Sequence, residues 1–372
     1  MRAATFRRAA SGRLAPVLAL GLCCCVAAPV GAAASYFLTV DVPSDLGGST
    51  VEPHDLVRYG AGGYSLVEKL PPGSDVNALL RDPYGPWYFA PASPVTLGTV
   101  DFQPRDVVIW DGSSTPLFYG ESLGIPDYAR IDGLAVEVTS TTVLFLLSFD
   151  VPLTLDGTDY LPADIVSLDA FGGAGFALYW DSAGAGVPSS ANADGIELDG
   201  ADRLAMTFDA PVTLGGSTFL PGQLVRWDGG NSFSLYAADP SWPEGARPGG
   251  FTFVPAAGAV ADGTGGSTPL RARRLPGGQV ELTWGASCAL LDSDFAVYEG
   301  TLGGMFNDPI PATCTTGGAT TLAFTPDAGN GYFLVVPRNE VSEGSYGEAT
   351  GQLQRPPSTD ACLPQEIDLV CE

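Results

Sequence analysis

The fold is decided by a stretch that reads FDVPLTLDGTDYLPADIVSLD over residues 149–169. Its Val, Leu, Thr, Tyr and Ile residues favour strands, whereas its Pro and Asp-Gly steps favour turns. Two signatures stand out: a Leu followed by a Gly-containing turn at 155–157, and a Pro seven residues beyond that Leu. We therefore expect short strands separated by tight turns throughout this stretch.

The same two signatures occur four times along the chain. The Leu of the first signature is Leu46, Leu97, Leu155 or Leu214, and the Pro of the second is Pro53, Pro104, Pro162 or Pro221. Both series advance by 51, 58 and 59 residues. A spacing kept this strictly indicates an internal repeat. Aromatic-Leu-Tyr segments such as 233–236 and Asp-Gly-Leu/Ile segments such as 194–196 recur in most units.

Each repeat is predicted to supply four short strands. The first strand is exemplified by residues 144–149, and the second by residues 160–168, which have Pro near their start. The aromatic-Leu-Tyr segment is the third strand, and the Asp-Gly-Leu/Ile segment is the fourth. No sustained 3.6-residue apolar period predicts helices, so the chain is expected to be all-β. Four tandem repeats of about 55 residues favour a small β-propeller, with an array of packed sheets or sandwiches as the alternative. The fourth repeat lacks its closing piece, and residues 251–254 are a candidate strand to complete it.

The predicted organisation divides the chain into five parts. These are a signal peptide at 1–34, a four-repeat β domain at 35–255, a linker at 256–268, a second β domain at 269–355 and a Cys-containing tail at 356–372. The repeat units are placed at about 36–86, 87–142, 143–202 and 203–255. The repeats resemble those of uncharacterised exported bacterial proteins, a resemblance that implies no particular activity.

The first 34 residues have the pattern of an export signal. Arg2, Arg7, Arg8 and Arg13 precede an apolar run at 14–28 and small residues at 31–34. Cleavage near residue 34 predicts a protein that is secreted, on the cell surface or in the periplasm, with no membrane insertion of the mature chain. Lipid attachment at Cys23 and retention of the segment as a membrane anchor are the alternatives.

Residues 269–355 resemble a fibronectin type III domain. The resemblance rests on Trp284 in an early alternating strand, on Tyr332 after the Gly-Asn-Gly turn, and on the ending VPRN…EGSYG. It implies a β-sandwich with Trp284 in the core between the sheets and Tyr332 in the tyrosine-corner position. Such a domain implies spacing or adhesion and no chemistry.

The negative net charge of the chain argues against nucleic acid as a partner. The net charge of −25 becomes −29 when the four arginines of the signal are removed, and such a chain repels phosphate backbones, so nucleic-acid binding is not expected. The abundance of acids leaves calcium as a possible cofactor. Asp55, Asp106 and Asp164 recur after the repeat Pro and are either caps of the turn or weak candidates for calcium ligands, although Gln223 takes their place in the fourth unit.

Four cysteines follow the signal, in an even number that suits disulfides in an oxidising compartment. Four cysteines allow three pairings. The favoured pairs are Cys288–Cys314 and Cys362–Cys371, because each joins neighbours in the sequence.

No credible catalytic constellation emerges from the sequence. Residues 120–124 match G-x-S-x-G, but no helix pattern follows, and the sole histidine, His54, precedes the serine and is expected to be an exposed turn residue. We therefore expect a non-catalytic binding, adhesion or scaffold protein that recognises an extracellular protein or glycan. The alternative is a secreted carbohydrate-active hydrolase that uses Asp and Glu residues.

Overall fold

The computed structural model describes residues 35–60, 63–81, 86–138, 142–170, 175–199, 203–239, 242–260, 269–289, 292–302, 309–327, 330–349 and 353–367. The predicted signal peptide, most of the predicted linker and Cys371 lie outside these ranges. The described part is all-β, with two short 3₁₀ turns, Gly120–Leu123 and Pro276–Gly278. None of its helices has the length and apolar character that crossing a bilayer requires.

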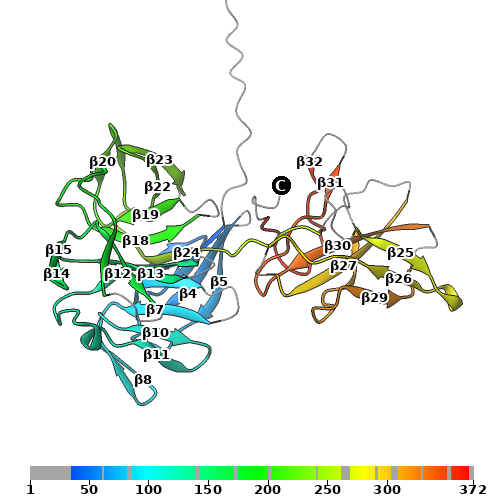
Figure 1. The fold of residues 1–372 in the computed structure, drawn as a ribbon, viewed down its shortest axis with the longest axis horizontal. Coiled ribbons are helices and arrows are strands. Elements are labelled where there is room, and N and C mark those ends of the chain that lie inside the picture. The colour runs from blue at the N-terminus through cyan, green and yellow to red at the C-terminus, as the bar shows by residue number, and fades with distance from the viewer. Residues whose placement is uncertain are drawn as a thin grey trace, which may run out of the picture. The chain divides into compact units, whose positions relative to one another are not determined.

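The repeats form a four-bladed β-propeller (Figure 1). The first blade holds β24 (Pro248–Phe253), β1 (Tyr36–Val40), β4 (Asp55–Gly60) and β5 (Gly63–Lys69). The second holds β6 (Val76–Arg81), β7 (Trp87–Pro91), β10 (Val107–Trp110) and β11 (Ser114–Phe118). The third holds β12 (Ile131–Val138), β13 (Val143–Phe149), β16 (Ile165–Asp169) and β17 (Ala177–Trp180). The fourth holds β18 (Ala193–Leu198), β19 (Leu204–Phe208), β22 (Leu224–Gly229) and β23 (Ser232–Ala237).

The inner strands β24, β6, β12 and β18 contact one another in a closed cycle around the axis. They are almost fully buried, whereas the outer strand β5 is largely exposed. Four hydrophobic clusters fill the spaces between neighbouring blades; Leu134, for example, packs with residues of the second blade and Ile196 with residues of the third. Burial between blades therefore stabilises the ring, because each sheet covers the apolar face of the next.

Blade boundaries are offset from the sequence repeat. The last piece of each of the first three repeats becomes the inner strand of the next blade, so β12 ends the second repeat but belongs to the third blade. Residues 251–253 do close the ring, as predicted, but in β24 they complete the first blade rather than the fourth. Pairing the last strand with the first joins the two ends of the repeat region and leaves no blade without an inner strand (Figure 1).

Each blade also carries a small hairpin, which the sequence did not separate from the second strand. The hairpins are β2–β3 (Ser44–Leu46, Ser49–Val51), β8–β9 (Val95–Leu97, Val100–Phe102), β14–β15 (Leu153–Leu155, Thr158–Tyr160) and β20–β21 (Val212–Leu214, Ser217–Phe219). Pro162 lies in the turn between β15 and β16 instead of beginning a strand. The Leu-Gly signature is the hairpin turn, where Asp156 and Gly157 have φ values of 50° and 80°. This left-handed backbone explains why glycine recurs there.

Small residues let the inner strands approach one another. Ala78, Gly133, Gly195 and Gly250 follow equivalent bulges in the four inner strands. A Cβ on Gly133 would lie 2.8 Å from Cγ1 of Ile196, and one on Gly195 would lie 2.9 Å from Cδ1 of Phe251. Packing therefore requires Gly at these two positions, since real Cβ contacts are longer.

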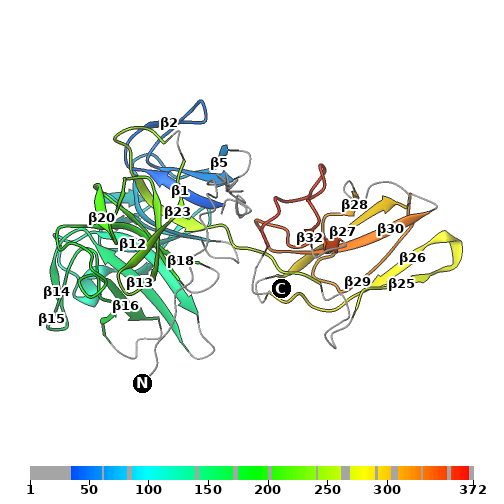
Figure 2. The same ribbon diagram turned by 90° about the horizontal axis from the view of Figure 1, so that it is seen from above.

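The C-terminal part is a sandwich of two three-stranded sheets (Figure 2). One holds β25 (Arg271–Arg274), β26 (Val280–Thr283) and β29 (Thr321–Phe324), and the other holds β28 (Ile310–Thr313), β27 (Asp294–Thr301) and β30 (Gly331–Arg338). A short hairpin, β31 (Glu348–Ala349) with β32 (Leu353–Gln354), follows. Trp284 is 3% exposed between the sheets, and Tyr332 lies opposite Gly300. Membership of the fibronectin type III family stays a prediction, because many β-sandwiches share this packing.

The tail is part of this sandwich. Glu343 is fully buried and accepts hydrogen bonds of 2.8 Å from Tyr298 and 2.6 Å from Tyr346. The tail amides of Cys362 and Leu363 donate to the Tyr298 hydroxyl and to Glu343. A buried polar cluster of this kind fixes the tail, because each group needs its partner once it has left water.

Both predicted disulfide pairs are wrong. Cys314 is bonded to Cys362, with Cα atoms 5.5 Å apart, and Cys288 is also disulfide-bonded. Cys314 follows β28, which pairs with β27, and the tail returns to Tyr298 on β27. Tertiary contact therefore brings Cys362 to Cys314, whereas the prediction relied on nearness in sequence.

Candidate binding site at one end of the propeller axis

Each inner strand of the propeller carries a β-bulge near its start. The bulged residues are Asn77, Asp132, Asp194 and Gly249. Because the inner strands surround the axis, these equivalent residues lie at the same end of it. Bulges redirect side chains and often lie beside functional sites. We call the region formed by these residues and their polar neighbours the axial site.

Asp132 holds neighbouring blades together at the axial site. Asn77 donates to its Oδ1 across 2.5 Å, and Asn192 donates to its Oδ2 across 2.6 Å. Asn77 also donates to the carbonyl oxygen of Ile131. Asp132 is 3% exposed, and burial raises its pKa to about 7 against the opposing effect of the two amides.

Asp194 is buried without a hydrogen-bond donor among the described residues. It is 6% exposed, and its nearest cation is Arg247, whose Nη1 lies 3.9 Å from Oδ2. Burial, followed by the nearby charge of Asp132, raises the pKa of Asp194 well above its usual value, which Arg247 only partly opposes. A carboxylate in this position is short of donors, because an ionised Asp can accept several hydrogen bonds.

Arg247 supplies the positive charge of the axial site. Its backbone N and Nε donate to Asp41 across 2.7 and 2.9 Å, and its Nη1 lies 3.9 Å from Oδ2 of Asp209. One guanidinium thus faces three carboxylates, those of Asp41, Asp194 and Asp209. In the third blade the equivalent residue, Arg130, donates its backbone N to Asp150.

Two acceptor groups of the axial site lack a hydrogen-bond donor among the described residues. The Oδ1 atom of Asn192 is buried and has no partner among the described residues. Asp194 likewise receives no hydrogen bond there, while Nδ2 of Asn77 donates to Ile131 O and Asp132, and Nδ2 of Asn192 donates to Asp132. The arrangement therefore suits a ligand that brings hydrogen-bond donors and positive charge.

A third buried acid lies farther along an inner strand. Glu197 of β18 is 6% exposed and accepts a 2.6 Å hydrogen bond from Oγ1 of Thr252 on β24. Its own strand contributes the amide of Leu198. Burial raises the pKa of Glu197 to about 7 despite these donors. Neutral Glu197 can therefore remain between the blades, where an ionised group would be costly.

The predicted calcium candidates lie in three separate blades, where they cap turns. Oδ2 of Asp55, Asp106 and Asp164 accepts the backbone N–H three residues earlier, across 3.1, 2.7 and 2.8 Å. Oδ1 of Asp106 accepts from Gly120 N, and Oδ1 of Asp164 accepts from Ser182. Gln223 makes the equivalent turn bond across 2.8 Å, which explains why an amide serves in the fourth blade. Calcium binding by these residues stays a prediction; within the described ranges, no three His, Cys, Asp or Glu side chains are placed to hold a metal ion.

The other sequence candidates lie outside the axial site. Ser122 is in an exposed 3₁₀ turn, where its hydroxyl donates to the carbonyl oxygen of Tyr119. His54 is not the exposed residue that was expected: its side chain is 19% exposed, and its Nδ1 lies 3.7 Å from Asp75. The turn packs against the start of β6, where Val76 N donates to Pro53 O. This packing covers the histidine.

The acids of the axial site belong to a segment that recurs in the sequence. Asp132-Gly133 and Asp194-Gly195 belong to the recurring Asp-Gly-Leu/Ile segments, for which the sequence predicts only the fourth strand of a repeat. Their clustering depends on the ring, which places equivalent positions of four repeats around one axis. Arg247 and Asn192 precede inner strands by the same interval, yet nothing local to the sequence marks them as neighbours.

Comparison with known proteins adds no function. No protein-family model matches this chain, and no curated protein is similar to it. A solved structure described as "YCF48 bound to D1 peptide" is 10% identical, with 72% of this chain and 78% of that chain covered and a TM-score of 0.23. The Neurospora crassa Pan2 WD40 domain is also 10% identical, with 82% and 83% covered and a TM-score of 0.23. Likenesses this weak carry no argument, so the propeller is assigned from strand topology.

Proposed function

We propose that this is an exported, non-catalytic binding protein whose propeller holds a cationic group of an extracellular protein at the axial site. The observation that carries the proposal is Asp194, a buried carboxylate with no hydrogen-bond donor among the described residues. A lysine or arginine side chain would supply the missing donors and the charge. The negative net charge of the chain would also attract a basic partner and speed association.

Proton release should accompany binding. Burial favours the neutral form of Asp194 in the free protein, and an approaching cation favours the ionised form. Binding should therefore strengthen as the pH rises. A neutral glycan, the other class of partner expected from the sequence, has no charge with which to produce this coupling.

Isothermal titration calorimetry with the peptide acetyl-Gly-Lys-Gly-amide tests the proposal. The control peptide carries an acetylated lysine side chain, and the protein is residues 35–372. We expect the free lysine peptide to bind more tightly at pH 8 than at pH 6, and Asp194→Asn to weaken it about tenfold or more. Asp101→Asn is the matched control, because it removes one acid from an exposed hairpin and should change affinity less than twofold.

Equal affinity for the two peptides, or equal effects of the two substitutions, would rule out specific recognition at Asp194. Circular dichroism and thermal unfolding establish that the Asp194→Asn protein is folded before it is titrated. The hydrolase alternative has its own readout, the release of reducing ends from polysaccharides. If the protein hydrolyses a polysaccharide and Asp132→Asn abolishes that activity, an enzymatic function would replace the binding proposal.

A further inference from the structure

The two sheets of the C-terminal sandwich have free edges that face a common groove. Among the described residues, β25 pairs only with β26. Besides its pairing with β27, β30 has a bridge from Arg338 to Glu343 and a bond from Gly344 N to Pro337 O, so its second edge is free over residues 331–336. A groove of about 410 Å³ lies between β25 and β30 and is lined by residues of both strands, including Ala272, Arg274, Gly331 and Phe333. Free edges present backbone N–H and C=O groups that can pair with an added strand.

The groove interrupts the sandwich core. Phe333 and Val280 line it and are half-buried, whereas Leu282 and Val335 in the same hydrophobic cluster are buried. All four residues of β25 are exposed. An apolar side chain entering the groove would therefore extend the existing core and remove apolar surface from water.

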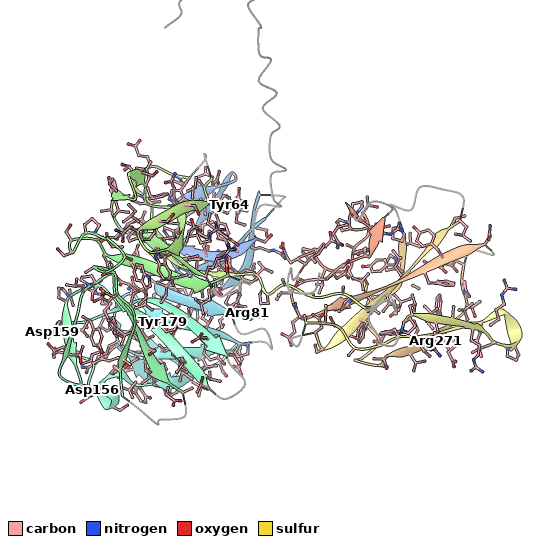
Figure 3. All side chains as sticks on the ribbon, turned by 45° about the horizontal axis from the view of Figure 1, so that its top comes forward. Tyr64, Arg81, Asp156, Asp159, Tyr179 and Arg271 are labelled. Carbon is pink, nitrogen blue, oxygen red and sulfur yellow. A yellow bond between two sulfur atoms is a disulfide. The ribbon has the colours of Figure 1, made fainter. Side chains whose placement is uncertain are left out.

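A basic cluster lies at the groove. Arg271, Arg273 and Arg274 lie on the exposed strand β25, and Figure 3 labels Arg271 on this part of the chain. Arg273 pairs with Glu281 across 2.8 Å, but no described acid pairs with Arg271 or Arg274. These unpaired cations stand out in a chain of net charge −25 and favour an anionic ligand.

We propose that this groove accepts an extended segment of a partner protein, in which apolar and acidic residues alternate, as an added β-strand. Its backbone would pair with the free edge of β25, and its apolar side chains would lie on the face of Val280, toward Phe333. Its acids would lie on the opposite face beside Arg271 and Arg273, because alternate residues of a strand share a face. Strand addition of this kind combines backbone affinity with side-chain specificity. The four residues of β25 span about 13 Å at ~3.3 Å per residue, so a short segment is enough.

Charge and the free edges together favour this occupant over others. A free anion would use the arginines but not the apolar lining or the backbone edges. A nucleic acid would meet the repulsion of the whole chain. A strand of alternating acidic and apolar residues would use the arginines, the apolar lining and the backbone edges of the groove together. The groove is independent of the axial site.

Fluorescence anisotropy with a labelled acetyl-VEVEVEVE-amide peptide provides the test, using residues 35–372. The controls are the corresponding Val-Lys peptide and a peptide in which two central residues of VEVEVEVE are replaced by proline. We expect only the uninterrupted acidic peptide to bind. Arg271→Gln combined with Arg273→Gln, which removes both arginines of one face of β25, should weaken it about three- to tenfold, in keeping with exposed ion pairs. Arg203→Gln, on the propeller, is the matched control and should have no effect.

Hydrogen exchange locates the bound strand independently of the substitutions. Protection of amides in residues 271–274 or 331–336 on addition of the peptide supports the proposal. No binding, protection at neither edge, or equal binding of the proline-containing peptide overturns it. Edge protection that rises with protein concentration alone, together with a dimer in sedimentation, would assign the groove to a second copy. Edge amides that are fully protected without peptide at every protein concentration would assign the groove to a segment of the same chain. A second copy or a segment of the same chain in the groove would each overturn the proposal that a partner's strand occupies it.

Discussion

Asn192 donates its Nδ2 hydrogen to Oδ2 of Asp132 across 2.6 Å and thereby joins the fourth blade to the third. The bond lies beside the axis, where Asn77 approaches Asp132 from the second blade. One carboxylate therefore links three blades. Such buried polar links add specificity to the otherwise apolar packing between sheets, since each must be satisfied in one arrangement.

Stability should fall as the pH rises, because burial raises the pKa of Glu197 from 4.5 to about 7. An acid that holds its proton more tightly when folded stabilises the fold fully below pH ~4.5, and this contribution is lost as the pH rises through 7. Between pH 5 and 8, Glu197 should contribute a decrease of about 2–3 kcal/mol. Urea unfolding at the two pH values should show that Glu197→Gln has a shallower dependence than the natural protein. Parallel pH dependences would mean that Glu197 does not titrate in this window.

Gly133→Ala should be destabilising because of close packing between the third and fourth blades. The added Cβ would lie 2.8 Å from Cγ1 of Ile196. Overpacking of this kind costs about 1–3 kcal/mol. Gly60→Ala is the control, since its Cβ would lie 3.0 Å from the movable hydroxyl of Ser35 and 3.8 Å from Ser35 Cβ, which is an ordinary contact. It should change the free energy of unfolding by less than about 1 kcal/mol. Equal losses in the two variants would contradict the inner-strand explanation.

Asp106→Ala should cost more than Gln223→Ala. Asp106 is buried and bonds both Gln103 N and Gly120 N, whereas Gln223 makes the turn bond at an exposed site. Leaving buried donors unpaired costs about 1–3 kcal/mol each. Chemical unfolding compares the two variants. Because N–H donors occupy both oxygens of Asp106, we also expect no change in Tm between excess calcium and chelator; a rise of several degrees with calcium would restore the metal hypothesis.

The Cys314–Cys362 bond should be a main source of stability in the C-terminal sandwich. The two residues are 48 positions apart, and closing a loop of that length stabilises a fold by about 4 kcal/mol in the chain-entropy treatment. Replacing both cysteines by serine should lower the Tm of the protein. Peptide mapping without reduction gives a direct check: a fragment joining Cys288 to Cys314 would contradict the observed pairing.

Repeat spacing was sufficient to predict an all-β propeller with four blades. The Leu-to-Pro interval of seven residues is a local property, because it spans one hairpin and the turn that Asp55, Asp106 and Asp164 cap. The prediction divided the blades in the wrong place. A repeat in sequence has no marked beginning, and only pairing between β24 and β1 defines where the ring closes.

By itself, the sequence determined the strands, the turns, the number of repeats and the acidic surface, all of which follow from residues close together in the chain. Only the tertiary structure decided the disulfide, the acceptor-rich axial site and the groove between β25 and β30. Cys314 meets Cys362, and Asp194 meets Arg247, because strand pairing brings together segments 48 and 53 residues apart. Burial then changes the chemistry of Asp194: a carboxyl that would ionise freely on a surface keeps its proton when the blades close around it.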